Sequence, residues 1–433
     1  MKAQANLDRQ IVAVDLDDTV HLLVELTAPP APNTTGRPPL DLVAVLDRSG
    51  SMSGDPLEGV KAAAELLLRL LAPGDRLALV TFDDEVVLEL PLAHHGDEAL
   101  PVIRGIDVGG STNLSGGWLK AREVLADARP GATRRIVLLT DGEANAGITG
   151  ADALADLAHA AAEGDITTTT IGYGEYFDED VLAAMASAGR GNTYWAAGAD
   201  ETPQIFAQEF DGLAAVVAQN ISLEIRPAEP VEVIAVLNDY RATPVAGGVQ
   251  IAVGDAFADE ERRVVVKLGV PGLSTLGPVV VAEVVLRYVL IGEAVQQHTV
   301  TMPIMVNVGT VDAADVVELD PAVVEEVLTL VAARTRKVAR RAVNDGRTDE
   351  AQAMLRRGSA ELRRSAATAS SPAKLLADAD AMDQAATDLE DVAKAASTSK
   401  AMWSLETTAS TGRSSRTTGP SAGDAASRND GES

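Results

Sequence analysis

The stretch LVAVLDRSGS, residues 42–51, decides the fold of this 433-residue chain. Its first five residues are apolar, as in a strand that is covered on both faces of a parallel sheet. A polar turn containing Gly50 follows at once, and Pro56 suits the first turn of a helix. The stretch therefore predicts a strand-to-helix unit whose polar turn lies at the carboxyl edge of an α/β sheet, where such folds bind ligands.

Strand and helix patterns alternate from residue 41 to about residue 217. Apolar runs predict strands at residues 42–46, 77–82, 86–90, 135–140, 166–171 and 193–195. Helical spacing of apolar residues predicts helices at residues 56–71, 114–128, 151–162, 179–188 and 202–217. We therefore expect a Rossmann-like α/β domain over residues 40–218, with a parallel sheet and helices on both faces.

Strand patterns dominate on both sides of this domain. Residues 219–311 contain apolar runs separated by turn sequences, which predicts a β-sandwich module. Residues 1–30 also contain short strands, and a proline-rich linker separates them from the α/β domain. Because these early strands have no partner nearby, we expect them to join the later module. The α/β domain would then be an insertion in the β-sandwich.

The C-terminal part is expected to be helical and then disordered. Apolar residues at helical spacing predict a helical unit over residues 312–396. Its Arg-rich segment, residues 334–341, would be a solvated face or would dock on the acidic body of the protein. Residues 397–433 are rich in Ser, Thr, Gly and Ala and poor in large apolar residues, which predicts a disordered tail.

Composition narrows the classes of function. The net charge of −28 argues against nucleic acid as the main partner. The chain has no cysteine, which excludes thiolate metal sites, and its five histidines are scattered. No segment resembles a signal peptide or is long and apolar enough to span a membrane, so we expect a cytoplasmic protein.

Five oxygen-bearing side chains are predicted to meet at one edge of the sheet. Asp47, Ser49 and Ser51 follow the first strand, Thr112 lies in a Gly-rich loop that opens a helix, and Asp141 ends another strand. Hard oxygen ligands with few charges suit Mg²⁺, although Mn²⁺ and Ca²⁺ accept the same donors. Such a site keeps a coordination position open for an external ligand.

These three segments resemble the metal-ion-dependent adhesion site of von Willebrand factor A (vWA) domains. The matching motifs are DRSGS at residues 47–51, GGSTNL at 109–114 and LLTDG at 138–142, in the same order and at similar separation. The resemblance implies that Ser49, Ser51 and Thr112 ligate the ion directly. It also implies that Asp47 and Asp141 bind directly or through water, and that a partner's Asp or Glu fills the open position.

The flanking β-module and helices resemble bacterial and inter-α-trypsin-inhibitor-like proteins that carry this domain. The resemblance implies a non-enzymatic, metal-dependent protein-binding module. Asn113 is the neighbouring residue most expected to touch the site, while Tyr176 and Phe177 are expected to contact the partner. The competing interpretation of the two aromatic residues is packing against the next helix.

Two alternatives remain open. VDLDDTV at residues 14–20 matches the nucleophile loop of haloacid-dehalogenase-type phosphatases, in which Asp15 would attack phosphorus and Asp17 would act as general acid. Gly254-Asp255 with Asp259 resembles their Mg²⁺ motif, but the strand pattern after residue 19 does not fit that family. The second alternative is self-recognition, in which an acidic residue of the tail reaches the metal of its own or another copy. The candidates for this role are Glu406, Asp424, Asp430 and Glu432.

Overall fold

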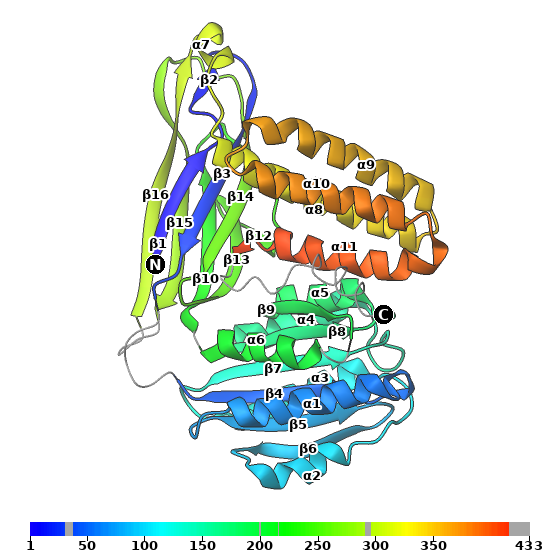
Figure 1. Ribbon diagram of the computed structural model, residues 1–433. Coiled ribbons are helices and arrows are strands. Elements are labelled where there is room, and N and C mark those ends of the chain that lie inside the picture. The colour runs from blue at the N-terminus through cyan, green and yellow to red at the C-terminus, as the bar shows by residue number, and fades with distance from the viewer. Residues whose placement is uncertain (31–37, 199–200, 215, 291–295, 415–433) are drawn as a thin grey trace, which may run out of the picture.

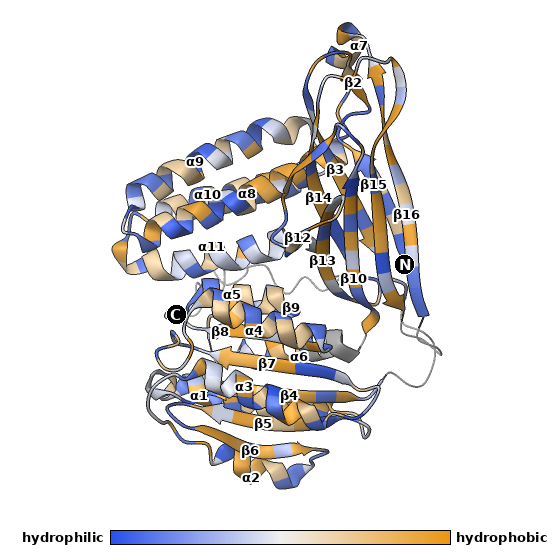
Figure 2. Cartoon of the chain, turned by 180° about the vertical axis from the view of Figure 1, so that it is seen from behind, coloured by the Kyte–Doolittle hydropathy of each residue, from blue (hydrophilic) through white to orange (hydrophobic). Residues whose placement is uncertain are grey.

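The computed structural model describes residues 1–30, 38–198, 201–214, 216–290 and 296–414. It contains an α/β part, a β-module and a group of C-terminal helices (Figure 1). Hydrophobic residues concentrate on the strands of both sheet-containing parts (Figure 2). Within the described residues, no helix combines the length and the apolar character needed to cross a membrane.

The α/β part is built on one six-stranded sheet with the order β6-β5-β4-β7-β8-β9. All strands run parallel except β6, which is antiparallel to β5. This confirms the parallel sheet expected from the alternating pattern. Its strands are β4 (Leu40–Asp47), β5 (Arg76–Phe82), β6 (Val86–Ala93), β7 (Thr133–Thr140), β8 (Ile166–Tyr173) and β9 (Arg190–Ala196).

Helices cover both faces of this sheet, as expected. Leu42 and Ala44 of β4 pack in one core with α1, α2 and α6, while Val43 and Val45 pack in a second core with α3, α4 and α5. The fully apolar run in β4 follows from this double burial, because successive side chains of a strand point to opposite faces. The helices are α1 (Asp55–Leu70), α2 (Leu100–Arg104), α3 (Leu114–Val124), α4 (Ala151–Glu163), α5 (Glu179–Ala188) and α6 (Thr202–Ala214).

The β-module consists of two sheets that share one hydrophobic core. One sheet has the order β1-β3-β14-β11, with β17 paired to β14, and the other has the order β12-β13-β10-β15-β16-β2. The strands are β1 (Lys2–Leu7), β2 (Ile11–Ala13), β3 (Asp18–Thr27), β10 (Val216–Pro227), β11 (Glu232–Val236), β12 (Ala242–Val245), β13 (Gly248–Phe257), β14 (Glu261–Val270), β15 (Gly277–Leu290), β16 (Gln296–Gly309) and β17 (Arg413–Ser414).

The N-terminal strands join this later module, as the sequence predicted. Strand β3 pairs with β14 over ten residues, and β2 pairs with the end of β16. The α/β part is therefore inserted in the β-module between β3 and β10. The helix expected to extend to residue 217 instead ends at Ala214, because the chain enters β10 at Val216.

The C-terminal helices pack mainly on one another and also contact the β-module. Ala339, Leu355, Leu375 and Met382 belong to their shared core. A small separate cluster joins Val323 and Leu330 of α8 to Leu23 of β3 and Val265 of β14. The helices are α7 (Val311–Asp315), α8 (Pro321–Asn344), α9 (Thr348–Ser365), α10 (Pro372–Asp388) and α11 (Ala395–Ser410).

The expectation of disorder from residue 397 is wrong for the described part of that segment. Residues 395–410 form α11, in which Met402 and Trp403 are 2% and 1% exposed. The small side chains that made this segment resemble a tail allow it to pack closely between α8 and the α/β part. Its single tryptophan adds one large, almost fully buried side chain to this contact. Residues 415–433, with Asp424, Asp430 and Glu432, lie outside the described residues.

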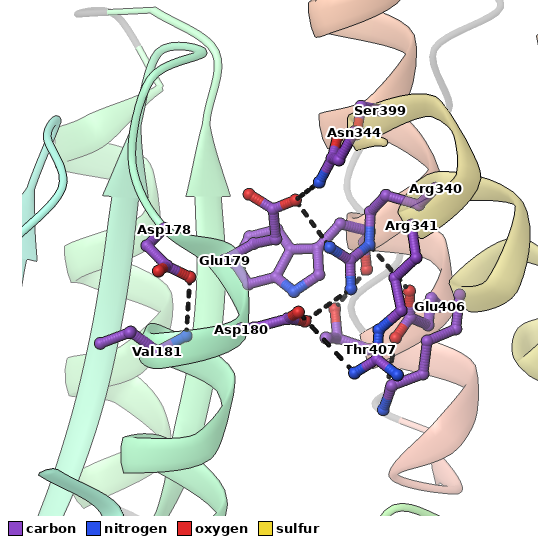
Figure 3. Close-up of polar contacts among 12 residues, drawn as sticks. Asp178, Glu179, Asp180, Val181, Arg340, Arg341, Asn344, Ser399, Glu406 and Thr407 are labelled. Atoms are coloured by element: carbon purple, nitrogen blue, oxygen red, sulfur yellow. Dashed lines mark hydrogen bonds and ion pairs between the residues drawn. The ribbon is translucent and has the colours of Figure 1, made fainter. Parts of the chain in front are cut away.

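The Arg-rich segment of α8 docks on the α/β part, the second of its two expected placements. Arg340 is 1% exposed and places its guanidinium 2.6 Å from Glu179 and 2.7 Å from Asp180, both in the first turn of α5 (Figure 3). Glu406 of α11 lies 3.4 Å from the same guanidinium. Lys400 of α11 also pairs with Glu179. Helices α8 and α11 thus hold α5 through a buried network of charges.

Candidate metal centre

The predicted site residues lie at the carboxyl edge of the α/β sheet. Strand β4 ends at Asp47 and the neighbouring strand β7 ends at Thr140, directly before Asp141. Because β4 and β7 are parallel neighbours, their last residues meet at the same edge. The Gly-rich loop is attached there by hydrogen bonds from Gly50 N to Gly110 O and from Gly109 N to Arg48 O. These contacts bring the three sequence motifs together.

Asp47 is the most enclosed residue of this group, with an exposed fraction of 0%. Its Oδ1 accepts a hydrogen bond of 2.8 Å from the backbone N–H of Ser49. Its Oδ2 accepts a hydrogen bond of 2.5 Å from the hydroxyl of Thr140. Both carboxylate oxygens are therefore held in place by the protein.

The hydroxyls of the turn extend this arrangement toward the second carboxylate. Ser51 Oγ donates to Asp141 Oδ1 over 2.7 Å, and Ser49 Oγ lies 3.2 Å from Ser51 Oγ. Thr112 is buried, and a β-carbon built on Gly142 would lie 3.6 Å from Thr112 Oγ1 and 3.7 Å from Ser51 Oγ. All five predicted side chains therefore border one small polar region.

The Gly-rich loop can approach the acidic residues that follow β5 only because it lacks side chains at two positions. A β-carbon on Gly109 would collide with the carboxylate of Asp83, and one on Gly110 with that of Asp84. The same carboxylates accept hydrogen bonds from the backbone N–H groups of Gly110 and Ser111. Acidic residues at the end of β5 thus fix the position of Thr112.

The electrostatics of the site favour a cation. Burial raises the pKa of Asp47 to about 6 against the opposing hydrogen bonds from Thr140 and Ser49, and the nearby charge of Asp141 also raises it. Burial likewise raises the pKa of Asp141, against the hydrogen bond from Ser51. Neither carboxylate forms an ion pair with any described residue. A positive ion between them would offset the cost of burying both charges.

The donor set consists of two carboxylates and three hydroxyls. The part of the chain that the structure describes contains no group of three or more His, Cys, Asp or Glu side chains placed to hold a metal. The arrangement therefore differs from a cage of carboxylates. It could hold a hard divalent cation only if water or an external ligand completed the coordination shell.

The α/β part matches a known protein family. Residues 41–208 match the family model of the von Willebrand factor type A domain. The chain contains a vWA domain. Domains of this family are generally adhesion or protein-interaction modules.

Similar sequences include bacterial proteins and animal inhibitor chains. The uncharacterized protein sll0103 of Synechocystis sp. is 30% identical over 263 residues, which cover 58% of this chain and 62% of that protein. The inter-alpha-trypsin inhibitor heavy chain H1 of Sus scrofa is 27% identical over 233 residues, which cover 51% of this chain and 25% of that protein. The chain thus spans less than two thirds of the length of these relatives.

The fold outside the vWA domain also recurs in solved structures. The von Willebrand factor type A protein from Catenulispora acidiphila matches with a TM-score of 0.71, at 17% identity, over 94% of this chain and 96% of that protein. The ArnB paralog VWA2 from Sulfolobus acidocaldarius matches with a TM-score of 0.62, at 17% identity, over 93% of this chain and 98% of that protein. The combination of a vWA domain, a β-module and C-terminal helices is therefore shared with these two proteins.

Asn113 has a structural role in the vWA domain. It is the N-cap of α3, because its Oδ1 accepts a hydrogen bond of 3.0 Å from Gly116 N. Two further residues, Thr140 and Asn145, support the candidate ligands, and this role was not predicted from the sequence. Asn145 Oδ1 accepts a hydrogen bond of 2.8 Å from Thr112 N. Thr140 lies within the LLTDG motif, whereas nothing in the local sequence marks Asn145.

The two aromatic residues expected at the partner surface have different environments. Tyr176 is 79% exposed on the loop after β8, consistent with the expectation. Phe177 is 2% exposed and packs edge-to-face on Trp403 of α11, with ring centroids 5.3 Å apart. The expectation that Phe177 contacts a partner is therefore wrong. Packing on the next helix was the competing interpretation, and Phe177 shares a core with Val181 of that helix, α5. The additional contact with α11 was not expected, because that segment was predicted to be disordered.

The phosphatase alternative is not supported by the surroundings of its residues. Asp15 lies in the turn between β2 and β3, and Asp17 accepts a hydrogen bond of 2.9 Å from Gly272 N. A strand follows this turn, where a phosphatase of that type requires a helix. Asp255 pairs at 2.6 Å with Arg135 of the vWA domain. Self-recognition through Glu406 is also excluded, because Glu406 is 3% exposed and paired with Arg340.

Proposed function

We propose that the vWA domain binds a divalent cation, preferentially Mg²⁺, through Asp47, Ser49, Ser51, Thr112 and Asp141. The cation would in turn bind an Asp or Glu side chain of a partner protein. The observation that carries this proposal is the pair of buried carboxylates, each bonded to a hydroxyl and neither neutralised by a described cationic side chain. Mn²⁺ and Ca²⁺ are the alternative ions, because both accept oxygen ligands.

The hydrogen bonds suggest how the donors divide their roles. Asp47 already accepts from Ser49 N and from Thr140, so it is suited to act through bound water. The hydroxyls of Ser49, Ser51 and Thr112 would be the direct protein ligands. Because such a shell contains little negative charge, the ion remains electrophilic enough to take an external carboxylate. The protein would act as a binding module with no catalytic step.

Metal binding is tested first, with Mn²⁺ as a paramagnetic probe and Mg²⁺ by titration calorimetry. We expect the Asp47→Ala, Ser49→Ala double variant to lose binding of both ions. Ser53→Ala is the matched control, because Ser53 is an exposed hydroxyl in the same turn but outside the donor set. Mn²⁺ binding that survives in the double variant would place the ion elsewhere and reject the proposal.

Partner binding is tested by a pull-down in Mg²⁺ and in EDTA. We expect proteins captured by the wild type in Mg²⁺ to be lost in EDTA and with the double variant. Capture that persists equally in EDTA would show that the vWA domain recognises its partner without a metal-bound carboxylate.

A further inference from the structure

The loops around the candidate metal site are strongly acidic. They comprise residues 48–55, 83–85, 107–113, 141–150 and 172–178, and are called the rim loops below. They contain nine acidic residues, one arginine and no lysine. The guanidinium of that arginine, Arg48, lies 3.3 Å from the carboxylate of Asp83. The only cationic side chain of the rim loops is thus already neutralised.

Five of these acidic residues face solvent: Asp55, Asp84, Glu85, Asp107 and Glu143. Within the described residues, none of the five forms an ion pair. Asp84 is held against the Gly-rich loop by the N–H of Ser111, and the loop that carries Glu143 is joined to Thr112 through Asn145. These exposed charges therefore lie on the loops that carry the candidate ligands.

This charge pattern restricts what can approach the metal. Like charges repel over about 8–10 Å at moderate ionic strength. An isolated carboxylate would be attracted by the ion but repelled by the surrounding acidic residues. A carboxylate with cationic neighbours would instead satisfy both the ion and the rim loops, because complementary charges favour association.

The rim loops also expose apolar side chains. Tyr176, Val108 and Ile148 are 79%, 40% and 39% exposed, and each belongs to a different rim loop. The loop that carries Tyr176 is anchored at the next residue, Phe177, which packs against Trp403. The ammonium group of Lys400 lies 4.1 Å from the centre of the Phe177 ring. Tyr176 is thus presented from a fixed position, as a contact residue at an interface would be.

We infer that the ligand of this surface is a protein segment in which one Asp or Glu is flanked by Lys or Arg and by apolar side chains. The inference rests on the proposed metal site and goes further by specifying the sequence character of the partner. The carboxylate binds the ion, the flanking cations pair with Asp84, Asp107 and Glu143, and the apolar side chains contact Tyr176, Val108 and Ile148.

Three capped peptides test this inference by fluorescence anisotropy in Mg²⁺ and in EDTA. The first is Ala-Lys-Leu-Asp-Leu-Lys-Ala, the second has Glu in place of both Lys residues, and the third has Asn in place of Asp. We expect the first peptide to bind about tenfold more tightly than the second, because several exposed ion pairs act together. We also expect its binding to require Mg²⁺, and the third peptide to bind weakly under both conditions.

Charge-neutralised variants show where the preference arises. The Asp84→Asn, Asp107→Asn, Glu143→Gln triple variant should lose most of the preference for Lys over Glu flanks. The control Asp312→Asn, Asp315→Asn, Glu318→Gln changes the net charge equally at exposed positions by α7, at the far end of the β-module (Figure 1), and should keep it. Tyr176→Ala should weaken binding of the first peptide about threefold to tenfold while leaving Mn²⁺ affinity unchanged.

The outcomes separate this inference from the proposed function. If the first two peptides bind equally and both require Mg²⁺, the inference is overturned and the metal-carboxylate function stands. If the first peptide fails to bind at millimolar concentration to protein that binds Mn²⁺, the inference is also overturned. If the third peptide binds as tightly as the first and EDTA has no effect, the surface recognises cations alone, which overturns the proposed function as well.

Discussion

Thr140 shows what the sequence could and could not predict at the scale of single residues. The five candidate ligands were recognisable because their local spacing is distinctive and because parallel strands end at one edge. The hydrogen bond of 2.5 Å from Thr140 to Asp47 joins two neighbouring strands, so it depends on their pairing. The same holds for Asn145, which reaches Thr112 from a separate loop.

We predict that Thr140→Val lowers the affinity for Mn²⁺ by about tenfold, the lower end of the effect of losing a residue that orients a metal ligand. Valine preserves the shape of the side chain but cannot donate a hydrogen bond to Asp47. Thr140→Ser keeps the hydroxyl and should retain near wild-type affinity. Calorimetry on both variants measures the difference, and equal affinities would show that this hydrogen bond does not orient the site.

The shifted pKa values of two glutamates in the buried charge network, Glu179 and Glu406, lead us to expect that the free energy of unfolding depends on pH. Burial would raise the pKa of Glu179, but Lys400 and then Arg340 outweigh it and hold that pKa at about 2. Burial raises the pKa of Glu406 to about 6, with a smaller contribution from the charge of Asp239 and against the charges of Arg340 and Lys337. The folded protein therefore takes up a proton at Glu406 at a pH where the unfolded chain does not.

We predict that the free energy of unfolding rises by about 2 kcal/mol as the pH falls from 7 to 5, because Glu406 and Asp47, whose pKa values burial raises to about 6, are both protonated more readily in the folded state. Below about pH 4.5 it should fall, because Glu179 is deprotonated more readily in the folded state than in the unfolded chain. Urea unfolding at pH 5 and pH 7 tests the first part. Glu406→Gln should remove about half of the rise, because Asp47 supplies the rest; an unchanged rise in that variant would assign it wholly to other groups.

At the scale of elements, α11 is the longest element that was not predicted from the sequence. Strand β4 was predictable because a fully apolar run has few alternative explanations. In α11 only Met402 and Trp403 are large, buried and apolar, and the remaining buried residues are Thr, Ser, Lys and Glu. The helix is stabilised by contacts with α8 and the vWA domain. Such contacts between segments far apart in sequence leave no periodic pattern in the segment itself.

Trp403→Ala should lower the free energy of unfolding by about 3–5 kcal/mol, because it leaves a cavity beneath α11. The exposed Leu405 on the same helix offers a matched control, since Leu405→Ala removes an apolar side chain that is 45% exposed. We expect that control to change stability by less than about 1 kcal/mol. Similar losses in the two variants would mean that α11 is not docked through Trp403.

At the scale of the whole molecule, the chain passes from the β-module into the vWA domain and back again. This insertion requires contacts that hold the two parts in place beside both connections. The sequence predicted the insertion from strands without local partners. It did not predict the ion pair of 2.6 Å between Arg135 of β7 and Asp255 of β13. Asp255 also accepts a hydrogen bond of 3.1 Å from Asn220 N, close to where the chain leaves the vWA domain. Gly254-Asp255 was considered instead as part of a phosphatase motif.

This ion pair makes the vWA domain and the β-module depend on one another, which a double-mutant cycle can measure. Arg135→Met should lower the free energy of unfolding by about 3–5 kcal/mol, because it leaves the carboxylate of Asp255 largely buried without its partner. Arg135→Met combined with Asp255→Leu should recover much of that loss, since no buried charge is then left unpaired.

The exposed pair Lys120–Glu123 provides the comparison, and its double-mutant cycle should give an interaction energy of less than about 1 kcal/mol. If the double variant at the interface were as unstable as the sum of its single variants, the two residues would act independently. The contact between the vWA domain and the β-module would then not depend on this ion pair.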